Sequence, residues 1–459
     1  MAISEELAEY TLGFAFENLS GDEVHAAKRT LLDTLACGVG ASQGNSSKIV
    51  RNFVKEQGGV QESTVIGSRI KVPCANAAFA NGAMVRYLDY NDTYWLRGKL
   101  RYGIHPDEFI PATLALAERQ YSSGKDVISS IILSYDLAGR FIDATYASPL
   151  GSRGRHYSTI AGFVVSLFAG RLLGLNKEQL VNGLGIAGVH SATLDIIDAA
   201  GETYNMTKNI GLPYVAQGGI TAALLAQKGF TGPTRVIEGN KGFVQTIMDG
   251  KFDLEILMRK RERPTIFDTD QKSLAAEHTT QGALNAVLKL VKEHNILPEQ
   301  VREVRIEVPT RTAEHTGDQA KRHPKDKETA DHSLYYVVAV AIIDRAVGPS
   351  QYSVEKLTSQ QVHKLMDKIT VEASPELDEF IYAGIAHIWM EDGRRFSCRV
   401  DYPKGNSRNP MTDEEIVEKF RGVASVVLDK ERVKRITDCV FELDKLKDIH
   451  PLMEPLAFG

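Results

Sequence analysis

The hydrophobic pattern of the 459-residue chain changes near residue 270, and this change constrains the fold more than any other feature. Before about residue 265, apolar residues recur at helical spacing, for example over residues 24–41, 125–141 and 158–175. These stretches are rich in Ala and Gly, whose small side chains let helices pack closely. Apart from the short run ESTVIG, this region shows almost no strand pattern. We therefore expect the first part of the chain to be helical.

The region after residue 270 mixes helical and strand patterns. Residues 332–347 have helical spacing, whereas residues 301–310 alternate between apolar and polar side chains. Two further alternating segments, 386–390 and 395–402, are joined by a turn that contains Asp-Gly. An Asp-Gly pair between alternating segments is a strong hairpin signal. This region is therefore predicted to form a smaller α+β domain.

Helical spacing returns at the end of the chain. Thr412 and Glu415 have the spacing of a capping box, and an apolar stripe runs from Val433 to Leu443. The simplest architecture is mainly α, with an α+β domain inserted into a helical domain that both chain ends form. The predicted limits are residues 1–268 and 405–459 for the helical domain and 269–404 for the α+β domain.

Composition and charge narrow the class of protein. Hydrophobic residues make up 43% of the chain and charged residues 25%, which is ordinary for a globular protein. The net charge of -5 leaves no basic footprint for nucleic acid. The N-terminus lacks a signal-peptide pattern, and the longest apolar stretch is interrupted by Arg171. We expect a cytoplasmic protein that binds neither nucleic acid nor a membrane.

Two motifs fail on their context. GLGIAG, residues 183–188, matches the glycine pattern of a dinucleotide-binding loop, but the residues before it have helical spacing where a strand is required. We interpret these glycines as helix-packing positions. The four cysteines are scattered, and no His or Cys pair has metal-ligand spacing. The sequence predicts neither a disulfide framework nor a metal site.

One short connection, residues 87–118, concentrates acidic, basic and anion-binding groups between two apolar, helix-like stretches. A loop only has to be hydrophilic, but carboxylates and histidine also exchange protons, and cations bind carboxylates. A reaction on a small carboxylic acid needs this combination. The side chains concerned are Asp89, Asp92, Thr93, Arg97, Lys99, Arg101 and His105.

Three other connections place titratable groups where a helix begins. His156 and Lys208 each precede an apolar helix, and Glu277 and His278 lie at the change of pattern. Taken singly, such residues are more often helix caps or solvated side chains. Taken together, they lie where helix N-termini attract anions, and they supply proton transfer and charge neutralisation. We therefore interpret the four connections as walls of one acid-binding site.

Several motifs, in order along nearly the whole chain, resemble the MmgE/PrpD family. They are AKRTLLDTLACGVGA, LDYNDTY, HPDE with PATLALAE, ETADHSLYYVVAVAIIDR and DYPKGNSRNPMTDEEIVEKF. The family includes 2-methylcitrate dehydratases, citrate dehydratases and cis-aconitate decarboxylases. ETADHSL and PKG…RNPMT look most like the bacterial 2-methylcitrate/citrate dehydratase branch. The resemblance implies a helical domain of both termini with an α+β lid, a homodimer, and no cofactor, metal or iron–sulfur cluster.

The resemblance also implies site residues. The Asp and Thr of the LDY-D-T motif match Asp89 and Thr93, and the HP histidine matches His105. The histidine before the apolar helix matches His156, and the lysine of the M-K segment matches Lys208. These matches imply that the connections listed above carry the family's active site.

Two positions depart from the family pattern. The lid histidine usually follows AE-x-H, but Thr279 occupies that position here and His278 stands one residue earlier. Asp107 replaces a serine that often follows HP, and we expect its carboxylate to repel a tricarboxylate unless Arg101 or its neighbours offset the charge. Tyr336 matches the tyrosine of the HS-x-x-Y motif.

These groups suit the dehydration of a β-hydroxy acid, in which a base removes a C–H proton, cations stabilise the charge that forms and an acid protonates the leaving oxygen. The leading hypothesis is a cofactor-independent hydro-lyase acting on 2-methylcitrate or citrate. Decarboxylation of cis-aconitate and epimerisation of iminodisuccinate are the alternative reactions, and a catalytically dead relative that only binds such acids is the non-enzyme alternative. The expected catalytic residues are Asp89, His105, His156 and Lys208, and the expected substrate-binding residues are Thr93, His278, Tyr336 and Arg101.

Overall fold

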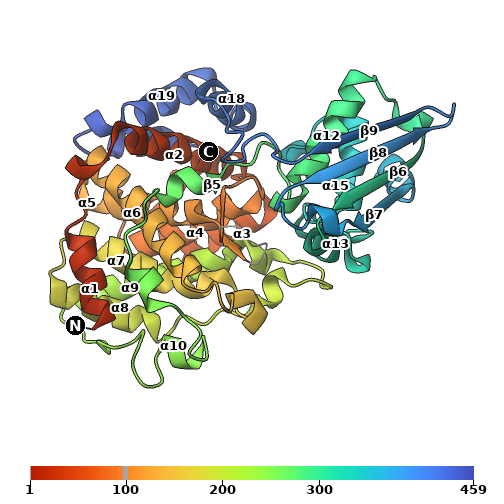
Figure 1. Ribbon diagram of the computed structural model, residues 1–459. Coiled ribbons are helices and arrows are strands. Elements are labelled where there is room, and N and C mark those ends of the chain that lie inside the picture. The colour runs from red at the N-terminus through yellow and green to blue at the C-terminus, as the bar shows by residue number, and fades with distance from the viewer. Residues whose placement is uncertain (1, 97–101) are drawn as a thin grey trace.

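The computed structural model describes residues 2–96 and 102–459, and it is mainly helical (Figure 1). Its buried apolar side chains form two separate cores. One core draws on residues 7–266 and 411–458, and the other on residues 275–390. We call the structures around these cores the helical body and the α+β body. The prediction of a mainly α fold is confirmed, while the domain limits given above stay a prediction.

The helical body packs its helices around α4, almost all of whose residues are buried. α4 contacts α2, α3, α5 and α9, and α7 packs against α8 and α9. The first part of the chain contributes these helices to the helical body: α1 (Ile3–Leu12), α2 (Gly21–Gly40), α3 (Asn45–Gln57), α4 (Cys74–Tyr87), α5 (Ile110–Gln120), α6 (Gly124–Asp143), α7 (Ala161–Leu172), α8 (Lys177–Gly188), α9 (Gly211–Gln227), α10 (Phe243–Thr246) and α11 (Leu254–Met258).

The end of the chain returns to the helical body as α18 (Asp413–Ala424), α19 (Lys430–Phe441) and α20 (His450–Met453). α18 packs along α2, so segments from opposite ends of the sequence lie side by side (Figure 1). The predicted capping box is confirmed: Thr412 Oγ1 accepts a hydrogen bond from the Glu415 backbone at 3.2 Å, and Glu415 accepts one from the Thr412 backbone at 2.7 Å.

The glycines of GLGIAG lie inside α8, where they bring neighbouring segments close. A Cβ added to Gly183 would meet Ala223 of α9 at 3.6 Å, and one added to Gly188 would meet Phe163 of α7 at 2.5 Å. The interpretation of this motif as helix packing is therefore confirmed.

The α+β body contains a four-stranded sheet of order β7–β6–β8–β9, in which β6 is parallel to β7 and antiparallel to β8. The predicted hairpin is confirmed as β8 and β9, with Gly393 of its turn at φ 88°. α12 packs on β8 and β9, and α15 packs on β7. The elements of this body are α12 (Gln281–Glu293), β6 (Val301–Val308), α13 (Thr310–Thr316), α14 (Lys327–Ala330), α15 (Leu334–Asp344), α16 (Val354–Leu357), α17 (Gln360–Met366), β7 (Ile369–Ala373), β8 (Gly384–Met390) and β9 (Arg395–Val400).

A small three-stranded sheet joins the two bodies. β3 (Thr93–Trp95) pairs with β4 (Gly103–Ile104) on one side and with β5 (Thr269–Asp270) on the other. β5 is the segment on which the chain leaves the helical body, so this pairing brings the 87–118 connection beside the start of the α+β body. A separate two-residue pair, β1 (Ser63–Thr64) with β2 (Lys71–Val72), lies elsewhere in the helical body.

None of the helices in residues 2–96 and 102–459 combines the length and the apolar character that a membrane crossing requires.

Candidate active site

A cavity opens where the helical body meets the α+β body, and both bodies contribute to its wall. Of the eight residues predicted for the site, Thr93, His105 and His278 line this cavity. Its described wall consists of Thr93, Trp95, Tyr102, Gly103, His105, Tyr157, Asp195 and Asp198 from the helical body and of Glu277, His278, Thr279, Arg311, Thr312 and His315 from the α+β body.

His105 follows β4 and is held in one tautomer. Its Nδ1 donates a hydrogen bond to the backbone carbonyl of Asp92 and lies 3.1 Å from Thr93 Oγ1. A carbonyl only accepts, so Nδ1 carries the proton and Nε2 keeps a lone pair. Burial and the positive charges of Arg86 and Lys272 lower the pKa of His105 well below its usual value. His105 is therefore a neutral imidazole with a basic Nε2 in the cavity region.

His278 forms a dyad with Glu277 across the cavity from His105. Its Nδ1 lies 3.0 Å from Glu277 Oε1, and its buried Nε2 has no hydrogen-bond partner among the described residues. The His278 ring lies 4.6 Å from the Trp95 ring and 6.0 Å from the His105 ring. Burial raises the pKa of Glu277 to about 7, while burial and the charge of Lys272 lower the pKa of His278 well below its usual value. Near neutral pH the dyad therefore takes up a proton on Glu277.

Thr279, which stands where the family pattern has the lid histidine, contacts the carboxylate of Glu277. The Thr279 hydroxyl and backbone N–H both donate to Glu277 Oε2, at 2.6 and 2.8 Å. The threonine thus holds the carboxylate of the dyad, while the imidazole of His278 lies on the cavity wall.

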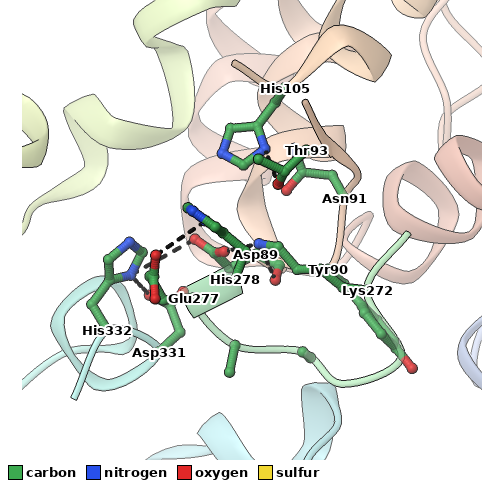
Figure 2. A network of polar contacts seen from close by, with 12 residues as sticks. Asp89, Tyr90, Asn91, Thr93, His105, Lys272, Glu277, His278, Asp331 and His332 are labelled. Carbon is green, nitrogen blue, oxygen red and sulfur yellow. Dashed lines mark hydrogen bonds and ion pairs between the residues drawn. The ribbon is translucent and has the colours of Figure 1, made fainter. Parts of the chain in front are cut away.

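Asp89 lies beneath this wall at the centre of a buried ion-pair network (Figure 2). It follows α4 in a left-handed turn at φ 50°, which aspartate tolerates. Arg86 Nη1 and Lys208 Nζ lie 2.6 and 2.8 Å from its Oδ2, and Lys272 Nζ contacts its Oδ1. Burial alone would raise its pKa, but Arg86, Lys208 and Lys272 hold it well below the usual range. An ionised carboxylate with three cationic partners is a weak base.

Lys208 belongs to the same network, although the sequence suggested that its ammonium would face the cleft. Its Nζ lies 2.8 Å from both Asp89 Oδ2 and Asp331 Oδ1, and 3.3 Å from His332 Nδ1. Asp331 also binds Lys327 at 2.6 Å. The network therefore joins segments of both bodies, as Figure 2 shows for Asp89, Asp331 and His332.

His156 caps the 3₁₀ turn Tyr157–Ile160. The backbone N–H of Ser158 donates to His156 Nδ1 at 3.3 Å, so the proton of the neutral ring is on Nε2. Burial lowers the pKa of His156 to about 4. Its ring centroid lies 3.9 Å from that of Tyr157, which lines the cavity. His156 is thus a helix cap, and it is also a hydrogen-bond donor one side chain behind the wall.

Two predicted substrate-binding residues are not brought to the cavity by the described structure. Tyr336 is buried in the core of the α+β body, where its hydroxyl donates to the carbonyl of Gln351 at 2.6 Å. Arg101, with Arg97 and Lys99, lies outside the described residues.

Asp107 is buried and is not among the residues that line the cavity. Its carboxylate accepts hydrogen bonds from Asn91 Nδ2 at 3.2 Å and from the Asp92 backbone at 3.3 Å. Burial raises the pKa of Asp107 to about 6 and that of Asp92 well above its usual value, and a hydrogen bond joins the two carboxyl groups. The expected repulsion of a tricarboxylate by Asp107 therefore has no structural basis.

Sequence reasoning missed several members of the site. Lys272 adjoins a small pocket that Thr93 and His278 also line. Asp331 and His332 stand inside ETADHSL, so a motif was present, but nothing in its spacing pointed to Lys208 as their partner. Arg86 lies in α4, and only its nearly complete burial marks it as unusual.

The arrangement supplies the elements of acid–base chemistry on an anion. Two histidines lie on one cavity, and a carboxyl group beside one of them has a pKa near neutrality. The network below contains four cationic side chains and the carboxylates of Asp89 and Asp331. Glu108 also lies 3.6 Å from Arg86, but burial raises its pKa to about 8, so the cations outnumber the ionised carboxylates at pH 7. Such a field favours the binding of a carboxylate substrate.

Comparisons with known proteins agree with this chemistry. The MmgE/PrpD N-terminal domain matches residues 5–255, and the MmgE/PrpD C-terminal domain matches residues 274–444. Cis-aconitate decarboxylase of Aspergillus terreus is 28% identical, over 99% of this chain and 96% of its own. Cis-aconitate decarboxylase of Homo sapiens is 25% identical, over 97% of this chain and 93% of its own. 2-Methylcitrate dehydratase of Salmonella typhimurium is 22% identical, over 97% and 94%. Because the two domain matches together span most of its length, the chain belongs to the MmgE/PrpD family.

Proposed function

We propose that this chain is a lyase that acts on a small tricarboxylate, with dehydration of 2-methylcitrate or citrate as its leading reaction. The observation that carries the proposal is the pair of Nε2 atoms, on His105 and His278, that share one cavity above a positively charged network. The decarboxylases and dehydratases among its relatives support the same class of substrate.

His105 is assigned as the base. The Asp92 carbonyl fixes its Nδ1–H, so Nε2 is free to take the proton from the carbon next to a carboxylate. Burial keeps the ring neutral, so its Nε2 lone pair is available throughout the neutral pH range, and the negative charge of a bound carboxylate substrate would raise its lowered proton affinity. The negative charge that forms on the substrate carboxylate is stabilised by the field of Lys272, Lys208 and Arg86.

The Glu277–His278 dyad is assigned as the acid. Because the pKa of Glu277 is raised to about 7, part of the population near neutral pH holds one extra proton on the dyad. When that proton resides on His278 Nε2, it can be passed to the leaving hydroxyl group. His156 stands behind Tyr157 and is assigned to orient that tyrosine on the cavity wall.

Decarboxylation of cis-aconitate is the second candidate, and the higher identity of the decarboxylases favours it. Loss of CO₂ leaves a carbanion that needs only a proton donor. The dyad would supply this proton, whereas the base His105 would have no proton to remove. Dehydration therefore needs both His105 and His278, whereas decarboxylation needs only the Glu277–His278 dyad.

Proton NMR in D₂O tests the proposal on the purified protein. Samples contain 2-methylcitrate, citrate, cis-aconitate or iminodisuccinate. New vinyl signals from the first two acids indicate dehydration, itaconate indicates decarboxylation, and exchange of an α-proton alone indicates epimerisation. No turnover of any of the four acids would contradict the proposal and favour a protein that only binds them.

Two variants test the site itself. His105→Gln should reduce dehydration by roughly 100-fold or more, the usual scale for an acid–base group. His190→Gln is the matched control, because His190 is exposed at the end of α8. Near-normal dehydration by His105→Gln would show that the base has been assigned wrongly. Loss of dehydration with retention of itaconate formation would instead favour the decarboxylase.

A further inference from the structure

Three side chains from distant parts of the sequence converge beside the cavity. Asp198 ends the 3₁₀ turn Asp195–Asp198, His315 lies in α13, and His332 lies in the turn between α14 and α15. His332 Nε2 lies 3.7 Å from Asp198 Oδ1, and His315 Nε2 lies 3.9 Å from the same oxygen. One potential ligand atom from each residue fits within 4.8 Å of the other two.

Asp198 Oδ1, the oxygen that both histidines face, makes no hydrogen bond to the described residues. It is also shielded from solvent. The Asp198 side chain as a whole is 27% exposed, so the unpartnered Oδ1 is the shielded end of a partly buried carboxylate.

His332 faces this oxygen with an acceptor atom. His332 Nδ1 lies 2.5 Å from Asp331 Oδ1, which accepts its proton and leaves the lone pair of Nε2 toward Asp198. A carboxylate that holds the far nitrogen of an imidazole is the usual second partner of a metal-bound histidine.

The surroundings leave room for a cation. Tyr204 Oη lies 3.2 Å from His315 Nε2, and its hydroxyl can turn from the histidine to the Asp198 carboxylate. Lys208, which lies 3.3 Å from His332 Nδ1, is already paired with Asp89 and Asp331. Asp198 and His315 also line the cavity, so an ion can enter from it.

The spacing favours a metal ion over an ammonium group. Ligands with bonds of about 2.0–2.1 Å lie roughly 3.3–3.4 Å apart around a tetrahedral zinc ion. Acceptors around an ammonium nitrogen, at about 2.8–3.0 Å, lie roughly 4.6–4.9 Å apart. The observed 3.7 and 3.9 Å need to close by about half an ångström to fit the metal, and the two histidines, whose ligand atoms lie within 4.8 Å of each other, need to close by up to about 1.4 Å.

We propose that Asp198, His315 and His332 form a binding site for a divalent transition-metal ion such as Zn²⁺ or Co²⁺. Two imidazoles and one carboxylate are a familiar ligand set for these ions. Three protein ligands leave a coordination position open toward the cavity, where water or a carboxylate oxygen can bind. The site is independent of the proposed reaction, because its test measures metal binding and not turnover.

The test uses the full-length protein after treatment with a chelator and removal of the chelator. Equilibrium dialysis against Zn²⁺ should give one tightly bound ion per chain, and Co²⁺ should produce the visible absorption of a four- or five-coordinate site. Asp198→Asn and His315→Gln should each weaken binding by about 100-fold or more, because loss of an outer partner alone costs roughly 10–100-fold. Both residues lie on the cavity wall, so the metal-free variants should melt close to the parent.

The matched control is His323→Gln. The His323 and His363 rings stack with centroids 6.2 Å apart, and His323 Nε2 lies 3.7 Å from Asp367 Oδ1, so this is a pair of histidines near a carboxylate that lies away from the cavity wall. This variant should bind one Zn²⁺ as tightly as the parent.

Three results would overturn the proposal. The parent could bind neither Zn²⁺ nor Co²⁺, or it could bind them as tightly after either cavity substitution. Binding of L-aspartate that depends on Asp198, without metal binding, would assign the site to an ammonium group instead.

Discussion

Lys419 offers a sharp test of how the site is held in place. This lysine of α18 donates to the backbone carbonyls of Tyr90 and Lys272, at 2.7 and 2.9 Å, and its Nζ lies 2.7 Å from Asp33 Oδ1. Tyr90 follows Asp89, so the ammonium holds the two segments that carry Asp89 and Lys272. The substitution to examine is Lys419→Met, which keeps the apolar stem and removes the charge.

The magnitude follows from burial. The side chains of Lys419 and Asp33 are only 3% and 1% exposed, so removing the lysine leaves a carboxylate in the core without its counter-ion. Breaking a buried pair in this way costs roughly 3–5 kcal/mol. The two carbonyls lose their donor as well, at about 1 kcal/mol each. We therefore expect a loss of roughly 5–7 kcal/mol at neutral pH.

The loss should depend on pH. Burial raises the pKa of Asp33 even with Lys419 present, and removing the lysine raises it further. In the variant, the folded state then holds a proton that the unfolded state releases above its own pKa of about 4. Stability of the variant therefore falls as the pH rises from about 4 toward the pKa of the folded state. The defect should be smaller at pH 5 than at pH 7.5.

Calorimetry at these two pH values measures the effect. Asp33→Asn in the Lys419→Met background should restore much of the loss, because it removes the uncompensated charge. Lys434→Met is the control, since Lys434 pairs with Asp438 on an exposed helix surface and its loss should leave the melting temperature unchanged. Equal losses for the two lysine variants, or no recovery with Asp33→Asn, would refute the reasoning.

The remaining predictions concern the site and its surroundings. Tyr336→Phe should lower stability by about 1 kcal/mol, through the lost bond to Gln351, and leave kcat/KM unchanged; a large fall in kcat/KM would return this tyrosine to the site. In the folded parent, Asp92 and Asp107 hold a proton that the unfolded chain releases, so the melting temperature of the parent should fall as the pH rises through about 6. Asp92→Asn keeps a donor toward Asp107 and should make this fall smaller. An unchanged pH profile would contradict the prediction. Lys208→Ala should lower both the melting temperature and turnover, because it leaves two buried carboxylates short of a cation, and an unchanged melting temperature would contradict the network. Turnover should survive EDTA, and a loss that Zn²⁺ restores would make the Asp198 site part of the reaction.

Much of the fold could be predicted because short stretches of sequence indicate its helices and strands. Alternation and Gly393 indicate the hairpin of β8 and β9, and a capping box of four residues, from Thr412 to Glu415, indicates the start of α18. His105 and Thr93 were predicted for the same reason, because they stand in one short connection whose residues remain neighbours in space.

Contacts between side chains that lie far apart in the sequence could not be predicted. Lys208 lies 123 residues from Asp331, and no periodicity links positions so far apart. Its loop context suggested an ammonium in the cleft, whereas tertiary packing buries it between two carboxylates. The His315–Asp198 cluster escaped notice for the same reason, since metal-ligand spacing is a rule about nearby residues and these ligands come from separate segments.

The buried network explains why a site for anions would keep its lysines out of the cavity. A free lysine on the wall is flexible and loses conformational freedom when substrate binds. Lys208 and Lys272 are already fixed by Asp89 and Asp331, so their positive field is in place before the substrate arrives. The cost is that each carboxylate and each cation of the network depends on the others. Substitutions there should change stability and activity together, whereas substitutions at His105 on the cavity wall should change activity with little effect on stability.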